Sequence, residues 1–281
     1  MRKMLLLGIL FPSLLHAQQL KLDLFGGFSN YQGDLQQKGF TTDQSRGAFG
    51  IGLQYSLTDH INVRTNFTYA RLGAADKFNK NSALQDRNLS FQTKLTEGNL
   101  LVDYNILNLE YHALTPYVFG GVAIFHFNPY AYDTAGNKVF LKPLSTEGEG
   151  LAAYPDRKLY NLTQFAIPFG VGLRWRLTDN LMIGYEIGLR KTFTDYLDDV
   201  SSTYVDQATL VSAKGAKAAE MAFRGGEVKG GATYPADGTI RGGSKYKDWY
   251  YFSGLTVSIG LGSPRRGSMK DRGNLSCPKV N

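Results

Sequence analysis

Residues 47–57, Gly-Ala-Phe-Gly-Ile-Gly-Leu-Gln-Tyr-Ser-Leu, alternate between large apolar side chains and small or polar ones. In an extended strand the large side chains share one face, which is formed by Phe49, Ile51, Leu53, Tyr55 and Leu57. The opposite face carries only alanine, glycine, glutamine and serine. A period of two with one bulky apolar face indicates a strand that faces lipid or a protein core on that side.

The same alternation returns at residues 164–177, where seven large apolar residues alternate with small or polar ones that include Arg174 and Arg176. Both a soluble sandwich and a membrane barrel fit this periodicity, because either fold has one apolar and one polar strand face. The lengths of the connections between strands have to separate the two folds.

The alternating segments predict eight strands, at about residues 20–30, 47–57, 61–72, 95–107, 115–127, 164–177, 181–191 and 248–261. Short connections at 58–60, 108–114 and 178–180 alternate with long ones at 31–46, 73–94, 128–163 and 192–247. In outer-membrane barrels the tight turns face the periplasm and the long loops face outward. The pattern predicts an all-β, eight-stranded antiparallel up-and-down transmembrane β-barrel with both termini in the periplasm.

The N-terminal residues 1–17 have the form of a signal peptide: Arg2 and Lys3 precede an apolar stretch that ends at Ala17. Beyond it no apolar run reaches the roughly 20 residues that a membrane-spanning helix needs, and the mean hydropathy of the chain is −0.24. We therefore expect a signal peptide at 1–17, an outer-membrane barrel at 18–262 and a basic periplasmic tail at 263–281.

The interior of an eight-stranded barrel is filled by side chains. Charged residues on the inward faces of the predicted strands can pair there, where water is scarce. The candidates for the lumen are Arg64, Glu97, Asp103, Arg174, Arg176, Glu186 and Arg190. A filled lumen predicts that solutes do not pass.

Few residues suggest catalysis or metal binding. His126 and Asn128 share a strand face, but an amide cannot be the nucleophile that a neighbouring histidine would activate, so a structural hydrogen bond is the favoured interpretation. The carboxylates of residues 194–204 either bind calcium or accept hydrogen bonds within the loop, and the second interpretation is favoured. The histidines and the single cysteine lack zinc-site spacing. We expect no enzyme activity, cofactor, metal site or small-molecule substrate.

Residues 207–247 are rich in alanine, glycine and lysine, which predicts a mobile outer loop. The tail at 263–281 carries most of the positive charge that remains after export, so we expect no nucleic-acid partner. The same tail holds Cys277, the only cysteine. In an oxidising compartment it either stays a free thiol or bonds to another chain.

Particular strings carry a family resemblance: residues 115–122, 126–129 and 167–172, then Arg190–Ser201, and Asp248–Thr256 near the end. Together they resemble the PorG family of outer-membrane barrels, which belong to the type IX secretion system of the Bacteroidota. The stretch from Lys191 to Ser201 is the most specific part, whereas the insert at 207–247 matches no pattern of the family.

This resemblance implies a non-enzymatic scaffold that anchors the periplasmic ring of PorK, a lipoprotein, and PorN to the outer membrane. The tail is expected on the same side, so its residues are candidates for ring contact, namely Arg265, Arg266, Lys270, Arg272 and Cys277. We expect a Cys277 disulfide with the lipoprotein, and contact of the barrel with outer-membrane lipids. The alternatives are a structural or adhesion barrel like OmpA or OmpX, and a lipid-modifying barrel enzyme.

Overall fold

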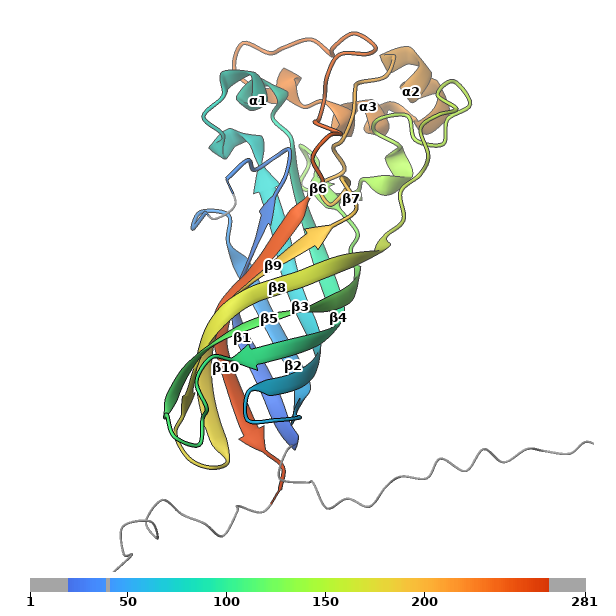
Figure 1. Cartoon of the computed structure of the whole chain (residues 1–281). Helices are drawn as coiled ribbons and strands as arrows, with labels where there is room; N and C mark the ends of the chain where they lie inside the picture. Colours follow the sequence, from blue (N-terminus) through green and yellow to red (C-terminus); the bar gives the residue numbers. More distant parts are fainter. Residues whose placement is uncertain (1–19, 39–40, 263–281) are drawn as a thin grey trace, which may run out of the picture.

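The computed structural model describes residues 20–38 and 41–262, and its main body is a closed antiparallel β-barrel (Figure 1). Eight long strands form the wall: β1 (Leu20–Gln32), β2 (Arg46–Ser56), β3 (Ile61–Ala75), β4 (Ser90–Asn105), β5 (Leu114–His126), β8 (Thr163–Arg176), β9 (Leu181–Thr192) and β10 (Trp249–Gly260). Each wall strand pairs with the next along the chain, and β1 pairs with β10 to close the barrel. The predicted eight-stranded fold is confirmed.

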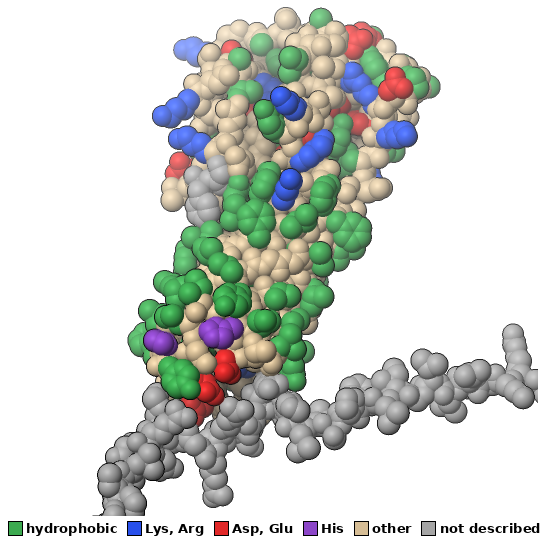
Figure 2. Space-filling model, in the orientation of Figure 1, with side chains coloured by type: hydrophobic (Ala, Val, Ile, Leu, Met, Phe, Trp, Pro, Cys, Tyr) green, Lys and Arg blue, Asp and Glu red, His purple; other side chains and the backbone are tan. Residues whose placement is uncertain are grey.

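The wall has an apolar outer surface because side chains alternate across each strand. Phe49, Phe67, Val122, Phe165 and Leu255 face outward, and each is more than half exposed. Green side chains accordingly cover much of the lower and middle wall on the face that Figure 2 shows. A sandwich would bury this face as its core, so the exposure marks it as a lipid-facing surface.

The two ends of the barrel differ in their connections. Residues 57–60, 106–113 and 177–180 make short turns at one end. Both the start of β1 and the end of β10 lie at this end, since Lys21 pairs with Gly260. We name the opposite, long-loop end the cap, which comprises residues 33–38, 41–45, 76–89, 127–162 and 193–248.

Short elements give the cap its order. A hairpin of β6 (Tyr130–Tyr132) and β7 (Lys138–Phe140) attaches to β4 through the bridge from Gln92 to Tyr130. Three α-helices and three 3-10 helices complete it: α1 (Ser82–Arg87), α2 (Gln207–Lys214), α3 (Ala216–Ala222), η2 (Asp76–Phe78), η3 (Lys142–Leu144) and η4 (Gly225–Glu227). Within the described residues, no helix is long and apolar enough to cross a membrane.

The prediction of a mobile loop at 207–247 was wrong for its first half. The Asp206 side chain accepts a hydrogen bond from the Thr209 N–H at 2.7 Å and so caps α2. Leu210, Ala218 and Ala222 are fully buried in a small apolar cluster with Val205. Alanine is the strongest helix former, and its small side chain lets α3 lie close to its neighbours. The alanine-rich composition, which predicted a flexible loop, therefore forms packed helices.

Candidate functional site

An ionic network fills the middle of the barrel. The Arg64 guanidinium on β3 bonds Asp103 at 2.9 Å and Glu186 at 3.0 Å, so it joins β3 to β4 and to the far wall. Arg174 on β8 bonds the same Asp103 at 2.9 Å. The Tyr117 hydroxyl donates to Glu186 at 2.8 Å. All of these side chains are buried, and the opposite charges offset the large cost of removing each ion from water.

A second ion pair lies closer to the cap. Arg190 on β9 bonds Glu97 on β4 at 3.3 Å, and the Tyr250 hydroxyl donates to the same carboxylate at 2.6 Å. The lumen cavity between the two networks measures about 20 Å³, which accommodates about one water molecule. At this level side chains therefore fill the lumen, as the sequence predicted.

Six of the seven residues predicted for the lumen lie there. Arg176 is the exception, because it sits at the last residue of β8 and its guanidinium reaches the Glu110 carbonyl at the exposed short-turn end, 3.4 Å away. The alternation assigned Arg176 to the correct face of its strand. Its height along the barrel axis depends on the register between strands, which alternation does not reveal.

An apolar layer separates the ionic lumen from the cap. Its fully buried members come from several strands and from the loops after β5 and β9, and they include Tyr31, Phe91, Leu95, Phe125, Phe127, Leu197 and Phe252. The Tyr31 and Phe91 rings meet edge to face, with centroids 4.9 Å apart. The barrel is thus closed a second time at the level where the loops begin.

Glu147 and Arg241 form the centre of the cap. The Glu147 carboxylate accepts hydrogen bonds from the backbone N–H groups of Ser201 and Ser202, each at 2.9 Å, and from the Ser202 hydroxyl at 2.6 Å. Arg241 donates to Glu147 at 2.9 Å and to the Asp199 carbonyl at 2.6 Å. Both side chains are buried. This clamp holds together three loop segments that are far apart in the sequence.

The acidic run at 194–204 supplies acceptors to this centre. Asp195 accepts from the Ser201 hydroxyl at 2.8 Å, and Asp198 accepts from Tyr31 at 2.6 Å. Asp199 accepts from the hydroxyls of Tyr160 and Thr146, both at 2.6 Å. The backbone φ of Asp199 is 67°, in the left-handed region that residues other than glycine rarely adopt. The carboxylates serve as hydrogen-bond acceptors, and the described residues contain no cluster of three or more ligands suited to a metal ion.

Burial raises the pKa of several cap carboxyls. It raises the pKa of Asp195 to about 7 and that of Asp199 to about 6. Burial, together with the negative charges of Asp199 and Glu147, raises the pKa of Glu149 to about 8. The cap therefore holds protons near neutral pH that the same groups would release in water.

The cap is expected to loosen as the pH rises. These three carboxyls have higher pKa values when folded than the ordinary 3.8 and 4.5 of the unfolded chain, so the folded cap binds more protons at intermediate pH. Their contribution to stability is complete below about pH 4 and is lost as the pH rises through about 6 to 8. Hydrogen exchange of residues 193–206, corrected for intrinsic rates, should show stronger protection at pH 5.5 than at pH 8.5. Equal protection at both values would contradict this linkage.

His126 has a different partner from the one considered on sequence grounds. Its ring nitrogen Nδ1 lies 3.0 Å from the hydroxyl of Thr163, the residue opposite it on β8. The Asn128 backbone N–H instead donates to the Thr93 hydroxyl at 2.9 Å. Both His126 and Thr163 are exposed at the end of their strands, and the contact between them is the structural hydrogen bond expected at the base of the loop.

Sequence reasoning missed Glu147, Arg241 and the buried ion pair between Arg87 and Asp76, whose nearest charged atoms are 2.7 Å apart. Single charged residues in irregular loops have no periodicity, so no pattern marks them. Five candidates for partner contact lie outside the described residues, namely Arg265, Arg266, Lys270, Arg272 and Cys277.

A closed eight-stranded wall with an apolar outer surface and a charged, filled interior is the architecture of integral outer-membrane β-barrels. The model of the family described as Domain of unknown function (DUF6089) matches residues 2–142 and 145–212. The chain belongs to this family, because the match spans more than half of its length.

Several solved outer-membrane barrels resemble the structure. Neisserial surface protein A is 10% identical, with 86% of this chain and 97% of that chain covered and a TM-score of 0.42. Ail of Yersinia pestis is 10% identical, covering 85% and 96%, with a TM-score of 0.40. A major outer membrane protein of Thermus thermophilus is 13% identical, covering 85% and 98%, also with a TM-score of 0.40. No curated protein matches the chain in sequence.

Proposed function

We propose that this chain is a non-enzymatic scaffold of the type IX secretion system that anchors the periplasmic PorK/PorN ring to the outer membrane. The observation that carries this proposal is the double closure of the barrel, by the ionic network around Arg64 and Asp103 and by the apolar layer above it. A barrel that is closed in this way acts through its surfaces rather than through its lumen.

The family resemblance favours this system over other scaffolds. Its most specific stretch, Lys191–Ser201, forms the last residues of β9 and the loop that fills the cap centre. Asp195, Asp198 and Asp199 in this stretch are all buried and hydrogen-bonded. The most specific stretch of the resemblance therefore supplies several of the buried groups around which the cap folds.

The proposed orientation has the cap outside the cell and the short-turn end in the periplasm, as the loop lengths favour. Gly260 then ends β10 on the periplasmic side. In this arrangement the basic tail that follows, with Arg265, Arg266 and Cys277, can reach the ring. The proposal includes contact of this tail with the PorK-like lipoprotein through a disulfide at Cys277.

Deletion of the gene in the native host tests the scaffold role. We expect proteins with a C-terminal sorting domain to disappear from the medium as a class and to return when the wild-type chain is restored. Non-reducing electrophoresis of outer membranes, with mass spectrometry of thiol-sensitive bands, should show a mixed disulfide to the lipoprotein that Cys277→Ser abolishes. Normal secretion in the deletion strain would overturn the scaffold role. Normal secretion and ring co-purification of Cys277→Ser would remove only the disulfide.

An adhesion barrel is the second candidate, and it is favoured by apolar residues on the cap surface. Ile240 and Tyr246 are 79% and 74% exposed, and exposed apolar side chains on loops often contact other proteins. In that case the deletion strain would secrete normally and lose binding to a surface. A lipid-modifying enzyme centred on His126 and Thr163 would instead be revealed by an altered lipid A mass in the deletion strain.

A further inference from the structure

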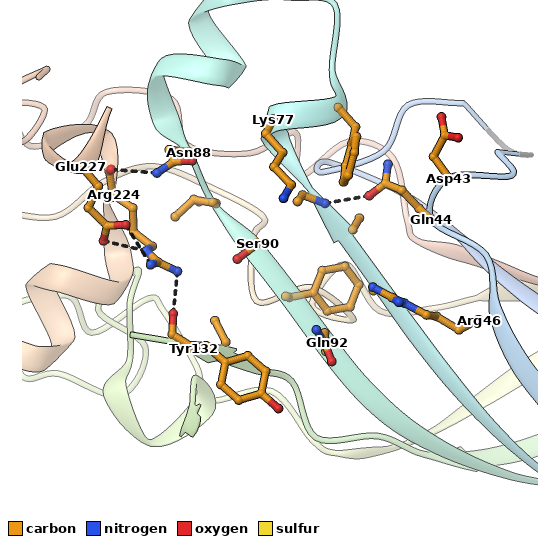
Figure 3. Close-up of a pocket in the computed structure, with 17 residues that line it drawn as sticks. Asp43, Gln44, Arg46, Lys77, Asn88, Ser90, Gln92, Tyr132, Arg224 and Glu227 are labelled. Carbon is orange, nitrogen blue, oxygen red and sulfur yellow. Dashed lines mark hydrogen bonds and ion pairs between the residues drawn. The ribbon is translucent and has the colours of Figure 1, made fainter. Parts of the chain in front are cut away.

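A polar groove lies where the wall of β3 and β4 meets the cap (Figure 3). Its volume is about 360 Å³. Its basic side chains come from three directions: Arg46 from β2, Lys77 from η2 and Arg224 from the loop before η4. Gln92 on β4 lines its barrel side, and Tyr132 on β6 lines its cap side. Figure 2 shows lysine and arginine side chains on the upper part of the molecule, above the apolar wall.

Two further basic residues face outward on the neighbouring wall. Arg71 on β3 stands directly opposite Lys94 on β4, and both are exposed. Like charges at opposed positions of adjacent strands repel each other. Within the part of the chain that the structure describes, neither forms an ion pair. An anion bound between them would remove the repulsion.

Tyrosines frame the two charges. The Arg71 guanidinium lies beside the Tyr69 hydroxyl and near Tyr130. Tyr130 in turn donates to the Gln92 amide oxygen at 3.2 Å, and the Lys138 ammonium lies 3.8 Å from the centre of its ring. Tyrosine is enriched at the interface between membrane and water, which favours a position of this surface at the depth of lipid headgroups.

The surface has an excess of positive charge. We name it the basic shoulder and define it as the groove together with the adjoining outward residues Tyr69, Arg71, Lys94 and Lys138 and the buried Tyr130 beneath them. Its acidic members are Glu227, which already pairs with Arg224 at 2.8 Å, and the exposed Asp43. The other five basic residues are Arg46, Arg71, Lys77, Lys94 and Lys138. A ligand with more than one negative charge fits this surface.

We propose that the basic shoulder binds the phosphorylated headgroup of a glycolipid in the outer leaflet, of the lipid A type. The apolar wall directly below, with Phe67 and Phe49, would hold the acyl chains, while Arg71 and Lys94 bind a phosphate between them. Ordered lipid on this side would help to fix the tilt of the barrel. The proposal rests on the orientation given above, in which the cap end faces outward.

Binding of purified lipid A to the full chain in phosphatidylcholine nanodiscs tests the proposal without secretion. Diphosphorylated lipid A, its dephosphorylated form and free inorganic phosphate are compared by native mass spectrometry. Each basic residue near a charged lipid surface contributes about five-fold in affinity. The double variant Arg71→Gln and Lys94→Gln should therefore weaken binding of the diphosphorylated lipid roughly 30-fold. The matched control is Lys158→Gln combined with Lys245→Gln, which removes two exposed cap charges outside the shoulder and should leave binding unchanged.

Circular dichroism confirms that each variant retains its barrel. Equal binding of the phosphorylated and dephosphorylated lipids, or equal loss in the shoulder and control variants, would overturn the proposal. Binding of free phosphate as tight as that of the lipid would also overturn it, since the acyl chains would then contribute nothing. Because the assay contains no secretion component, its failure leaves the scaffold proposal standing, and normal secretion in a deletion strain leaves the lipid site standing.

Discussion

The Asp103→Asn substitution is expected to lower the free energy of unfolding of the barrel by about 3–5 kcal/mol. Asp103 is fully buried and bonds both Arg64 and Arg174, each at 2.9 Å. The asparagine keeps the shape of the side chain but removes the negative charge, so two buried guanidinium groups face each other without sufficient compensation. Equilibrium unfolding in guanidinium at fixed detergent concentration, followed by the fluorescence of Trp175 and Trp249, measures the change.

Asp59→Asn is the matched control for this experiment. Asp59 is exposed in the turn between β2 and β3, where it accepts a hydrogen bond from the Asn108 amide at 3.2 Å. The same chemical change there should alter stability by no more than about 0.5 kcal/mol. A similar loss in both variants would mean that the ionic network does not stabilise the barrel as its geometry implies.

Glu147→Gln is expected to open the cap while the barrel stays folded. The substitution leaves Arg241 buried without its counter-ion and weakens the acceptor of the Ser201 and Ser202 N–H groups. Breaking a buried pair in this way costs about 3–5 kcal/mol, which is a loss of about two to nearly four orders of magnitude in protection. Hydrogen exchange of residues 193–206 and 239–248 measures that loss against unchanged protection of β3 and β4.

Glu227→Gln provides the comparison for the cap experiment. Glu227 also pairs with an arginine, Arg224, at 2.8 Å, but its side chain is partly exposed at the cap surface. Water replaces the lost interaction there, so the expected effect is less than about 1 kcal/mol. The hypothesis of a central clamp is rejected if exchange rises equally in the two variants.

The losses of stability expected for Asp103→Asn and Glu147→Gln concern different parts of the molecule and can be measured separately. The Asp103 network ties the far walls of the barrel together through β3, β4, β8 and β9. The Glu147 clamp ties loops to each other above the apolar layer. We therefore expect the first substitution to act on global unfolding and the second on local opening of the cap.

The stretch that is most specific for the resemblance to the PorG family lies at the centre of the cap. Residues 191–201 carry the most specific family strings, and their side chains are the acceptors around which the cap folds. The same stretch supplies two of the carboxyls whose pKa burial raises to about 6 and about 7, Asp199 and Asp195. Polar residues buried in a loop need specific partners, so such a stretch tolerates few substitutions.

The sequence by itself determined the number of wall strands, their bounds to within about five residues, their outward and inward faces and the alternation of turns and loops, but not the short β6–β7 hairpin in the cap. These properties are local, because a period of two and a run of turn residues are visible within about ten positions. The ion pairs of the lumen were predicted as a group, since all their members lie on inward faces.

Only the tertiary structure decided which of these groups meet. Arg64 reaches Glu186 across 122 residues, and Arg241 reaches Glu147 across 94. Contact at such separations depends on the register accumulated around the closed sheet and on loop paths, neither of which leaves a repeating pattern in the sequence. Arg176 shows how far the sequence prediction goes. Its inward strand face was predicted correctly, but the register places it at the short-turn end of the barrel. Alternation determines the direction in which a side chain points, and only the closed sheet determines its height and its neighbours.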